Sequence, residues 1–449
     1  LAEEQTEATQ KRMEDLNYFY NSLKETHPDI FANTDEKEFL SLKSEIEKGT
    51  AEDNDFEFAL DLEKLAALVG DSHTSVSLGN STAASIQYYP AEIDWFNGHW
   101  YLTMTENKDS DRIGMQVTHI NGIPMEEVLK KFSSFISFDN EVKLRRQFSE
   151  VSYVADMYEY AGIVSKGEPL DITLLDSKGT THTISLNPIG LSDLKKTDYT
   201  DIDDKRAAVP ETSYDQSKYY FSKPLNDSIY YIQYNQCAED ENYSMADFCK
   251  QVQSDLDNGA YQTVLVDLRY NGGGSDGVIA PLMLLLKQEM EHSDLQVAAL
   301  VAEKTFSSAI INAVEFQEMG CALVGEETSG SVDHFGSVTS FTLPNSQLKV
   351  KVSTKYISLS EYFDAAAGKG VESLVPDVVI RQTIEDYLAG RDTCVEKIIS
   401  DASCLKAEER ETAPLTRGRF IGELYQALGS PETEITSAPY DDLFGFEWY

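Results

Sequence analysis

The chain has 449 residues, of which 41% are hydrophobic and 10% aromatic, which is enough for about two or three domains with cores of their own. Its formal net charge of −40 at pH 7 opposes contact with nucleic-acid phosphates and with anionic lipid headgroups. The composition therefore excludes a disordered chain and disfavours nucleic acid and membrane surfaces as partners.

The first ten residues, LAEEQTEATQ, contain neither an initiator methionine nor a charged-then-apolar leader, and we expect an exported protein with a processed N-terminus. The longest apolar run, IAPLMLLL, is too short to span a bilayer and predicts a buried helix. The cysteines form no Cys-x-x-Cys pair, and no histidine stands at zinc-ligand spacing, so no metal is expected. Disulfides between Cys394 and Cys404, or between Cys237 and Cys249, are alternatives in an oxidising compartment.

Residues 1–85 predict a helical region. The segments KRMEDLNYFYNSLKE and FALDLEKLAALVG carry apolar residues at helical spacing, and Gly70 fits a helix stop. The alternating DSHTSVSL that follows predicts a strand.

Residues 86–192 predict a small β-rich module. The strand patterns AEIDWF, HWYLTMT and MQVTHINGIP precede LDITLLDSKGTTHTISL, in which residues 177–179 suit a hairpin turn. The polar stretch 193–217 has neither helical nor strand periodicity and predicts an exposed connector.

Beyond the connector, strand and helix patterns alternate. The strand patterns are SIYYIQYN, QTVLVDLRY, QVAALVA and CALVG, and the helix patterns between them are SMADFCKQVQSDLDNG, DGVIAPLMLLLKQEMEH and SSAIINAVEFQEMG. Continuous apolar strands separated by helices predict a mostly parallel sheet covered on both faces. Reactive groups of such sheets gather in the loops that follow the carboxyl ends of the strands.

Two of these loops carry residues suited to acyl-transfer chemistry. Ser307 opens a predicted helix, where a serine either caps the helix or acts as a nucleophile whose oxyanion the first-turn amides stabilise. In the other loop, Gly272, Gly273 and Gly274 expose backbone N–H groups that suit a developing anion. The Gly-Lys-Ser/Thr ending of a phosphate-binding loop is absent.

A serine nucleophile needs a base. His73 is the preferred histidine because GDSHTS places it after a helix end and between hydroxyl residues, and His334 in SVDHFG is the alternative. The remaining histidines lie in helix or strand patterns and fit surface or core positions: His27, His99, His119, His182 and His292.

The motifs LVGDSHTSV, VLVDLRYNGGG, TFSSA, ALVGEETSG and LVPDVVI occur in an order that resembles the C-terminal processing (tail-specific) serine peptidases, over most of the chain. The resemblance implies an α/β protein with a crotonase/ClpP-like catalytic core at residues 193–405, no cofactor, and a PDZ-like module at 86–192. In the lysine-dependent version of the family, a lysine stands where this chain has Ser331. No lysine occurs between Lys304 and Lys349, so the resemblance is to the histidine-containing, tricorn-core-like branch.

The resemblance also implies site residues. Ser307 would be the nucleophile, His73 its base and Ser72 an orienting hydroxyl. Glu372 in GVESLVPDV would be the third member, with Asp364 and Asp333 as alternatives. The oxyanion hole would consist of the backbone amides of Gly273, Gly274 and Ser308, which are the residues that follow the strand and the nucleophile. Ile310 departs from the family, which has a glutamate three residues after the nucleophile.

The tail, residues 406–449, contains APLTRGRFIGELYQALGSPE, which resembles part of an S-layer homology repeat and implies attachment to cell-wall polymers. A plain amphipathic helix is the alternative. We therefore expect a secreted or wall-associated bacterial serine endopeptidase that acts on peptides or unfolded proteins. The other hypotheses are a catalytically inactive peptide- or wall-binding relative and an acyl-CoA enzyme of the same fold, for which the chain offers no basic patch.

Overall fold

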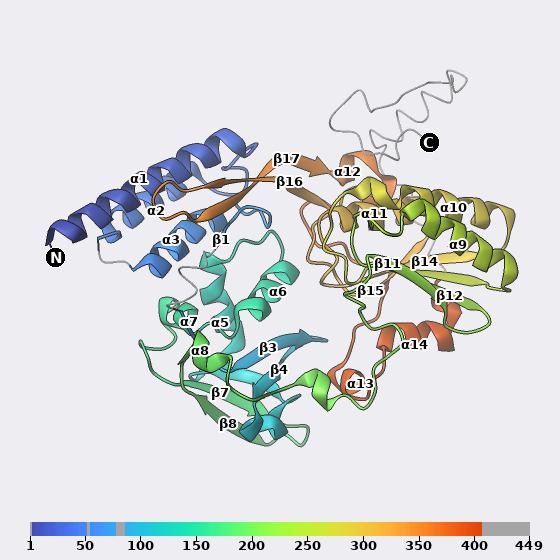
Figure 1. The fold of residues 1–449 in the computed structure, drawn as a ribbon, viewed down its shortest axis with the longest axis horizontal. Coiled ribbons are helices and arrows are strands. Elements are labelled where there is room, and N and C mark those ends of the chain that lie inside the picture. The colour runs from blue at the N-terminus through green and yellow to red at the C-terminus, as the bar shows by residue number, and fades with distance from the viewer. Residues whose placement is uncertain (1, 52–53, 78–85, 406–449) are drawn as a thin grey trace. The chain divides into compact units, whose positions relative to one another are not determined.

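The computed structural model describes residues 2–51, 54–77 and 86–405, which form two compact units (Figure 1). The first unit consists of the described residues of 1–207 together with 335–356, and the second consists of 208–334 and 357–405. The expected helical region and β-rich module thus share one unit. The tail with its expected S-layer repeat lies outside the described residues, so that repeat stays a prediction.

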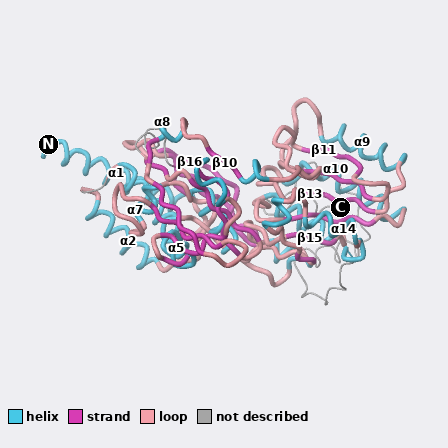
Figure 2. The backbone as a smooth tube through the Cα atoms, turned by 90° about the horizontal axis from the view of Figure 1, so that it is seen from below, coloured by secondary structure: helices cyan, strands magenta, loops and turns pink. Residues whose placement is uncertain are grey.

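The helical part of the first unit confirms the predicted helices. It contains α1 (Ala2–Thr26), α2 (Glu36–Gly49) and α3 (Asp55–Leu68), and Figure 2 shows α1 as one long helix at the N-terminal end. The Asp35 side chain caps α2, and Asn54 forms a capping box with Glu57 at the start of α3, which fixes where both helices begin.

A three-stranded sheet packs beside these helices and brings distant segments together. It consists of β1 (Ser75–Ser77), β17 (Lys349–Ser358) and β16 (Asp333–Thr342), with β17 in the middle. Val350 pairs with Val76 and is buried in one core with the apolar residues of the helices. This pairing explains why residues 335–356 belong to the first unit.

The β-rich part of the first unit is built on a seven-stranded sheet, and all of its strands were predicted except the short one at Tyr199–Asp201, which lies in the predicted connector. The sheet contains β3 (Ala91–Phe96), β4 (His99–Glu106), β5 (Gln116–Ile120), β6 (Ile123–Pro124), β7 (Leu170–Leu175), β8 (Thr181–Leu186) and β10 (Tyr199–Asp201). The expected hairpin turn between β7 and β8 is present, with Gly179 at φ 80°. β2 (Gln87–Tyr88) and β9 (Ile189–Gly190) form a separate pair.

Helices that the alternation did not reveal complete this part. They are α5 (Met125–Phe132), α6 (Glu141–Val151), α7 (Ala155–Tyr160) and α8 (Leu191–Leu194). The apolar residues of α5, α6 and α7 share one core with the strands, and Phe132 and Phe148 meet edge to face at 5.0 Å. The expected PDZ-like character of this module stays a prediction.

The second unit contains the mostly parallel sheet that the alternating patterns predicted. Its strands, in spatial order, are β11 (Tyr220–Pro224), β12 (Ile229–Tyr234), β13 (Thr263–Asp267), β14 (Gln296–Val301), β15 (Ala322–Gly325) and β18 (Val378–Val379). Only β11 runs antiparallel to its neighbour within this described sheet.

Helices cover both faces of this sheet, as expected (Figure 1). On one face lie α9 (Met245–Asn258), α10 (Ala280–His292) and α11 (Ser308–Glu318), and α14 (Thr393–Ser400) lies on the other. The short helices α12 (Leu359–Tyr362) and α13 (Ile384–Leu388) occupy the connections after β17 and β18.

All five cysteines of the chain are described, and all are free thiols, so the alternative disulfides of the sequence analysis are absent. Cys237 is buried, and its thiol lies 3.3 Å from Asn271 Oδ1 and 3.4 Å from Asn312 Oδ1. Among the helices of residues 2–405, none combines the length and the apolar character that crossing a membrane requires.

Candidate active site

Ser307 lies in a strained turn between β14 and α11. Its backbone has φ 54° and ψ −128°, a conformation that an L-residue rarely adopts. The side chain of Ser307 makes no capping hydrogen bond to the described amides of α11, so the capping interpretation is wrong. A strained serine at a strand-to-helix turn is the geometry that presents a nucleophile, and Ser307 is half-buried there.

The glycine loop that follows β13 touches this serine directly. Gly273 has φ 100°, and a Cβ atom added to it would lie 2.7 Å from the Cβ of Ser307. Gly274 has φ 140°, and its carbonyl accepts a hydrogen bond from the Ser308 hydroxyl at 2.8 Å. Only glycine satisfies both the left-handed backbone and the close approach.

The amides of this loop differ in availability. The N–H of Gly273 donates to Asn271 Oδ1 at 2.9 Å and is therefore already engaged. For the N–H groups of Gly274 and Ser308, no acceptor is found among the described residues. The oxyanion role expected of these three amides stays a prediction, and it is strongest for Gly274 and Ser308.

Asn271 holds the glycine loop in place through hydrogen bonds. Its buried side chain donates from Nδ2 to the Tyr234 carbonyl at 3.0 Å. Its backbone carbonyl accepts from the Phe306 N–H at 3.1 Å. These bonds connect the end of β12, the glycine loop and the residue before Ser307, so the two loops are held in one arrangement.

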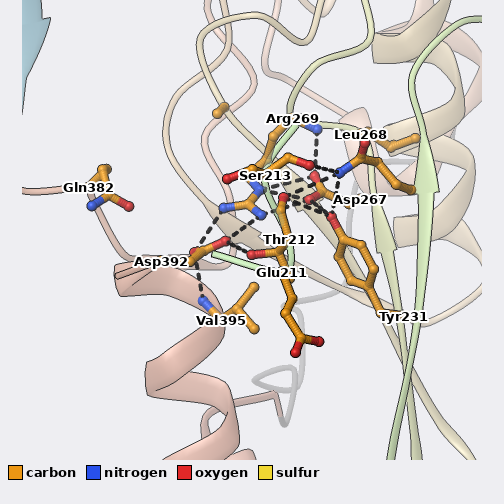
Figure 3. Close-up of polar contacts among 12 residues, drawn as sticks. Glu211, Thr212, Ser213, Tyr231, Asp267, Leu268, Arg269, Gln382, Asp392 and Val395 are labelled. Atoms are coloured by element: carbon orange, nitrogen blue, oxygen red, sulfur yellow. Dashed lines mark hydrogen bonds and ion pairs between the residues drawn. The ribbon is translucent and has the colours of Figure 1, made fainter. Parts of the chain in front are cut away.

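Figure 3 shows a buried ion-pair cluster at the start of the same loop. Arg269 turns back from the end of β13 and pairs with Asp267 and with Asp392, each at 2.7 Å from Nη2. Thr212 donates its hydroxyl to Asp392 at 2.6 Å, and Tyr231 donates to Asp267 at 2.6 Å. Burial alone would raise the pKa of Asp392, but the charge and hydrogen bonds of Arg269, together with the hydrogen bonds from Thr212 and the Val395 N–H, outweigh burial and lower it.

One residue of the predicted connector is buried in this cluster. Most of residues 193–217 are exposed or half-buried, as their polar composition predicted, but Thr212 is 4% exposed and packs against the sheet. Upstream, β10 pairs with β4.

The segment that carries Ser331 packs on the first turn of α11. The Gly330 N–H donates to the Thr305 carbonyl at 3.2 Å, and the Ile310 side chain fills the space beside Gly330. Ile310 therefore has a packing role where the family has a glutamate. His334, the alternative base, is 2% exposed and donates from Nδ1 to the Ser331 carbonyl at 2.9 Å.

The candidate third members occupy different environments. Glu372 is exposed, and its carbonyl accepts from the Val332 N–H at 2.9 Å. Asp333 is buried and accepts from the amide and the hydroxyl of Ser360, which gives it a structural function. Asp364 begins a short 3-10 helix (Asp364–Ala366). The role of Glu372 stays a prediction.

His73 belongs to the first unit and follows α3 in a sharp turn. Gly70 at φ 67° ends the helix, and the Asn33 amide donates to the Gly70 carbonyl at 3.0 Å. Asp71, which the sequence analysis did not select, accepts from the His73 N–H at 2.8 Å, and its Oδ1 lies 3.8 Å from His73 Nδ1. The Ser72 hydroxyl is buried and has no hydrogen-bond partner among the described residues, so Asp71 and not Ser72 contacts His73.

No protein-family model matches the chain, and no curated protein matches it. Solved structures do. The fold is similar to that of mature CPAF. That structure superposes with a TM-score of 0.61 at 11% identity and covers 88% of this chain and 97% of its own. Mature CPAF complexed with lactacystin gives a TM-score of 0.59 at 12% identity, with the same shares covered.

The photosystem II D1 C-terminal processing protease is also similar, at 12% identity over 82% of this chain and 92% of its own, with a TM-score of 0.37. Mature CPAF, with the TM-score of 0.61, is the comparison that supports the mixed α/β fold. The crotonase/ClpP-like core, the histidine-containing branch and the pairing of His73 with Ser307 stay predictions.

Sequence reasoning missed the residues that hold the site rather than those expected to react. Asp71 stands two residues before His73, a spacing typical of a turn in which an aspartate side chain accepts from the backbone. Asn271 and Arg269 lie in the quoted motif VLVDLRYNGGG, but nothing in that motif indicates their partners, which are distant along the chain.

Proposed function

We propose that this protein is a serine endopeptidase that hydrolyses peptide bonds through an acyl-enzyme. The strained backbone of Ser307, in direct contact with Gly273, is the observation that carries the proposal. Strain of this kind costs about 1–3 kcal/mol and persists where function requires a fixed hydroxyl. The order of the sequence motifs and the likeness to the CPAF fold support the same conclusion.

In the proposed reaction, Ser307 Oγ attacks the carbonyl carbon of the scissile peptide bond, and His73 accepts the hydroxyl proton. His73 then protonates the leaving amine as the C–N bond breaks, which leaves an ester on Ser307. Water then attacks this ester as His73 takes its proton, and His73 passes the proton to Ser307 Oγ as the ester C–O bond breaks, which releases the carboxyl product and restores the serine hydroxyl.

Two amides are proposed to stabilise the oxyanion. Gly274 is the last of the three glycines, and Ser308 follows the nucleophile. No described residue accepts a hydrogen bond from the N–H group of either. Preorganised donors of this kind lower the barrier because they need no reorganisation as charge develops. Glu372 is kept as the third member that would hold the imidazolium.

The decisive experiment compares hydrolysis of an unfolded protein substrate by the wild type, Ser307→Ala and Ser254→Ala. Ser254 is exposed on α9 and serves as the matched control. We expect Ser307→Ala to lower kcat by at least about 1,000-fold, since a triad without its nucleophile keeps only residual catalysis, and Ser254→Ala to retain the wild-type rate.

Labelling with a fluorophosphonate checks the nucleophile independently. Modification of the wild type at Ser307, located by peptide mass analysis, supports the acyl-enzyme. Equal hydrolysis by wild type and Ser307→Ala would disprove the proposed mechanism. Peptide binding without hydrolysis or labelling would instead support the inactive binding relative.

A further inference from the structure

A second buried histidine lies beside the His73 turn. His27 follows α1 and is 4% exposed, and the ring of Phe335 packs on it at 4.5 Å. Its Nδ1 accepts from the Asp29 N–H at 3.2 Å, so the ring proton is on Nε2 in the neutral form. Nε2 lies 3.3 Å from Asp71 Oδ2, and His27 therefore donates to Asp71.

Asp71 collects its contacts from three parts of the first unit. Besides His27, it accepts from the His73 N–H at 2.8 Å and from the Thr74 hydroxyl at 2.5 Å. Thr74 in turn accepts from the Ser353 N–H at 3.2 Å, which connects the turn to β17. The carboxylate is 1% exposed, so its geometry is set by these bonds rather than by water.

Asp71 carries the negative charge of this cluster. Burial alone would raise the pKa of Asp71, but the hydrogen bonds from His27, Ser353 and Thr74, together with the attraction to the imidazolium form of His73, outweigh burial, so the pKa is lowered. Asp71 is therefore ionised at neutral pH. The other groups that face it, Thr74 and Ser353, are neutral, and His27 and His73 are its titratable neighbours.

We propose that Asp71 is a positioning residue for His73 and that His27 fixes Asp71 in turn. Asp71 holds the His73 backbone through the amide and faces the Nδ1 side of the imidazole at 3.8 Å. The Nε2 side is thereby assigned to proton transfer. When the imidazole becomes charged, the nearby carboxylate stabilises the imidazolium. The distance from Nδ1 to Oδ1 then shortens to that of a charge-assisted hydrogen bond.

This inference rests on the proposed function, because His73 is its base. It adds a second carboxylate to the expectation drawn from the family resemblance, in which Glu372 is the third member. The carboxylate proposed here is local to the histidine motif and belongs to the same unit.

The test uses Asp71→Asn, His27→Ala and His27→Gln in the full chain. Asp15→Asn is the matched control, because Asp15 is an equally buried carboxylate of the same unit that accepts from the Asn345 and Ser346 amides. For each variant, kcat and KM are measured against pH, the His73 imidazole is titrated by NMR, and thermal unfolding reports folding.

We expect Asp71→Asn to lower kcat by about 100-fold with KM nearly unchanged, since it removes a charge that acts in the transition state. The His73 titration midpoint should fall by about one pH unit, because the imidazolium loses its counter-charge. His27→Gln, which keeps an N–H donor, should retain more kcat than His27→Ala. Asp15→Asn should melt at a lower temperature and keep the wild-type kcat and His73 midpoint.

Wild-type kcat and an unmoved His73 midpoint in Asp71→Asn would overturn the positioning role, even where Ser307→Ala is inactive and the proposed function stands. If Asp71→Asn does not fold, wild-type kcat and midpoint in His27→Ala overturn the inference in the same way. Full activity of Ser307→Ala would overturn the proposed function, while the NMR titration would still report the Asp71–His73 interaction.

Discussion

At the scale of single residues, the site depends on backbone conformations that most side chains disfavour. Ser307 is held at positive φ, and its neighbour Gly273 lies so close that no side chain fits between them. Such a conformation costs about 1–3 kcal/mol, so the surrounding bonds must fix it. The bonds made by Asn271 and by the Ser308 hydroxyl supply that constraint.

The close contact predicts a strict requirement at Gly273. In Gly273→Ala the new Cβ would meet Ser307 Cβ at 2.7 Å and the Phe306 carbonyl at 2.9 Å, and φ 100° would be strained. We expect kcat on a peptide substrate to fall by about 100-fold or more, because the nucleophile and the adjacent amides are displaced.

Gly272→Ala is the control for this prediction. Gly272 is the neighbouring glycine, and a Cβ there meets nothing within 4 Å. Its kcat should stay close to the wild-type value, and equal losses in the two variants would refute the contact argument. Thermal unfolding of both variants checks that the measured difference belongs to the site.

At the scale of elements, the glycine loop is held at the end of β13 by charges from segments remote in sequence. Arg269 bridges Asp267 of the strand and Asp392 at the start of α14, and Thr212 completes the shell (Figure 3). The polar connector at 193–217 is mostly exposed, as predicted. Thr212 within it is buried because its hydroxyl and carbonyl oxygens hydrogen-bond to buried partners, which hydrophobic periodicity does not reveal.

Removal of this charge should destabilise the second unit. Arg269→Met leaves the buried carboxylates of Asp267 and Asp392 without a counter-charge, which costs about 3–5 kcal/mol of the free energy of unfolding. Urea unfolding followed by circular dichroism measures the loss. Lys250→Met removes an exposed pair with Asp247 and should leave the midpoint nearly unchanged, so a similar shift in both variants would contradict the prediction.

At the scale of the whole molecule, the chain passes between two compact units, and residues 335–356 return to the first one. Within that unit, Glu63 of α3 is half-buried and accepts from the Val76 N–H and from the Ser137 hydroxyl. It therefore connects the helical part, the strand after His73 and the β-rich part. Burial raises the pKa of Glu63 to about 7 against these hydrogen bonds, which lower it.

The raised pKa predicts a pH-dependent stability. The folded state binds this proton more tightly than the unfolded chain, whose pKa is near the ordinary 4.5. The stabilisation is thus complete below about pH 4.5 and is lost as the pH rises through about 7. Relative to Glu63→Gln, the wild type should lose up to ~3 kcal/mol over this range, at about 1.4 kcal/mol per pKa unit.

Tryptophan fluorescence during urea unfolding measures this difference, because Trp95 and Trp100 lie in the same unit. Glu127→Gln alters an exposed carboxylate of that unit and should follow the wild-type profile. Parallel pH profiles for wild type and Glu63→Gln would show that Glu63 does not titrate as predicted.

The sequence by itself determined the local features. Periodicity located β12 to β15 and α9 to α11 of the second unit, most strands of the β-rich module and the junction that bears Ser307, because each depends on neighbours a few residues apart. The shorter elements β10, β11, β18 and α12 to α14 were not predicted. α6 and α7 were missed because α6 is mostly polar and α7 has only six residues, so neither shows a clear helical period.

Only the tertiary structure decided which distant groups meet. His27 and Asp71 are 44 residues apart, and Arg269 and Asp392 are 123 apart, yet each pair forms one buried contact. The dihedral strain of Ser307, the engaged amide of Gly273 and the return of residues 335–356 to the first unit likewise follow from packing. Buried polar groups take whichever partner the fold brings near, and that choice leaves no periodic trace in the chain.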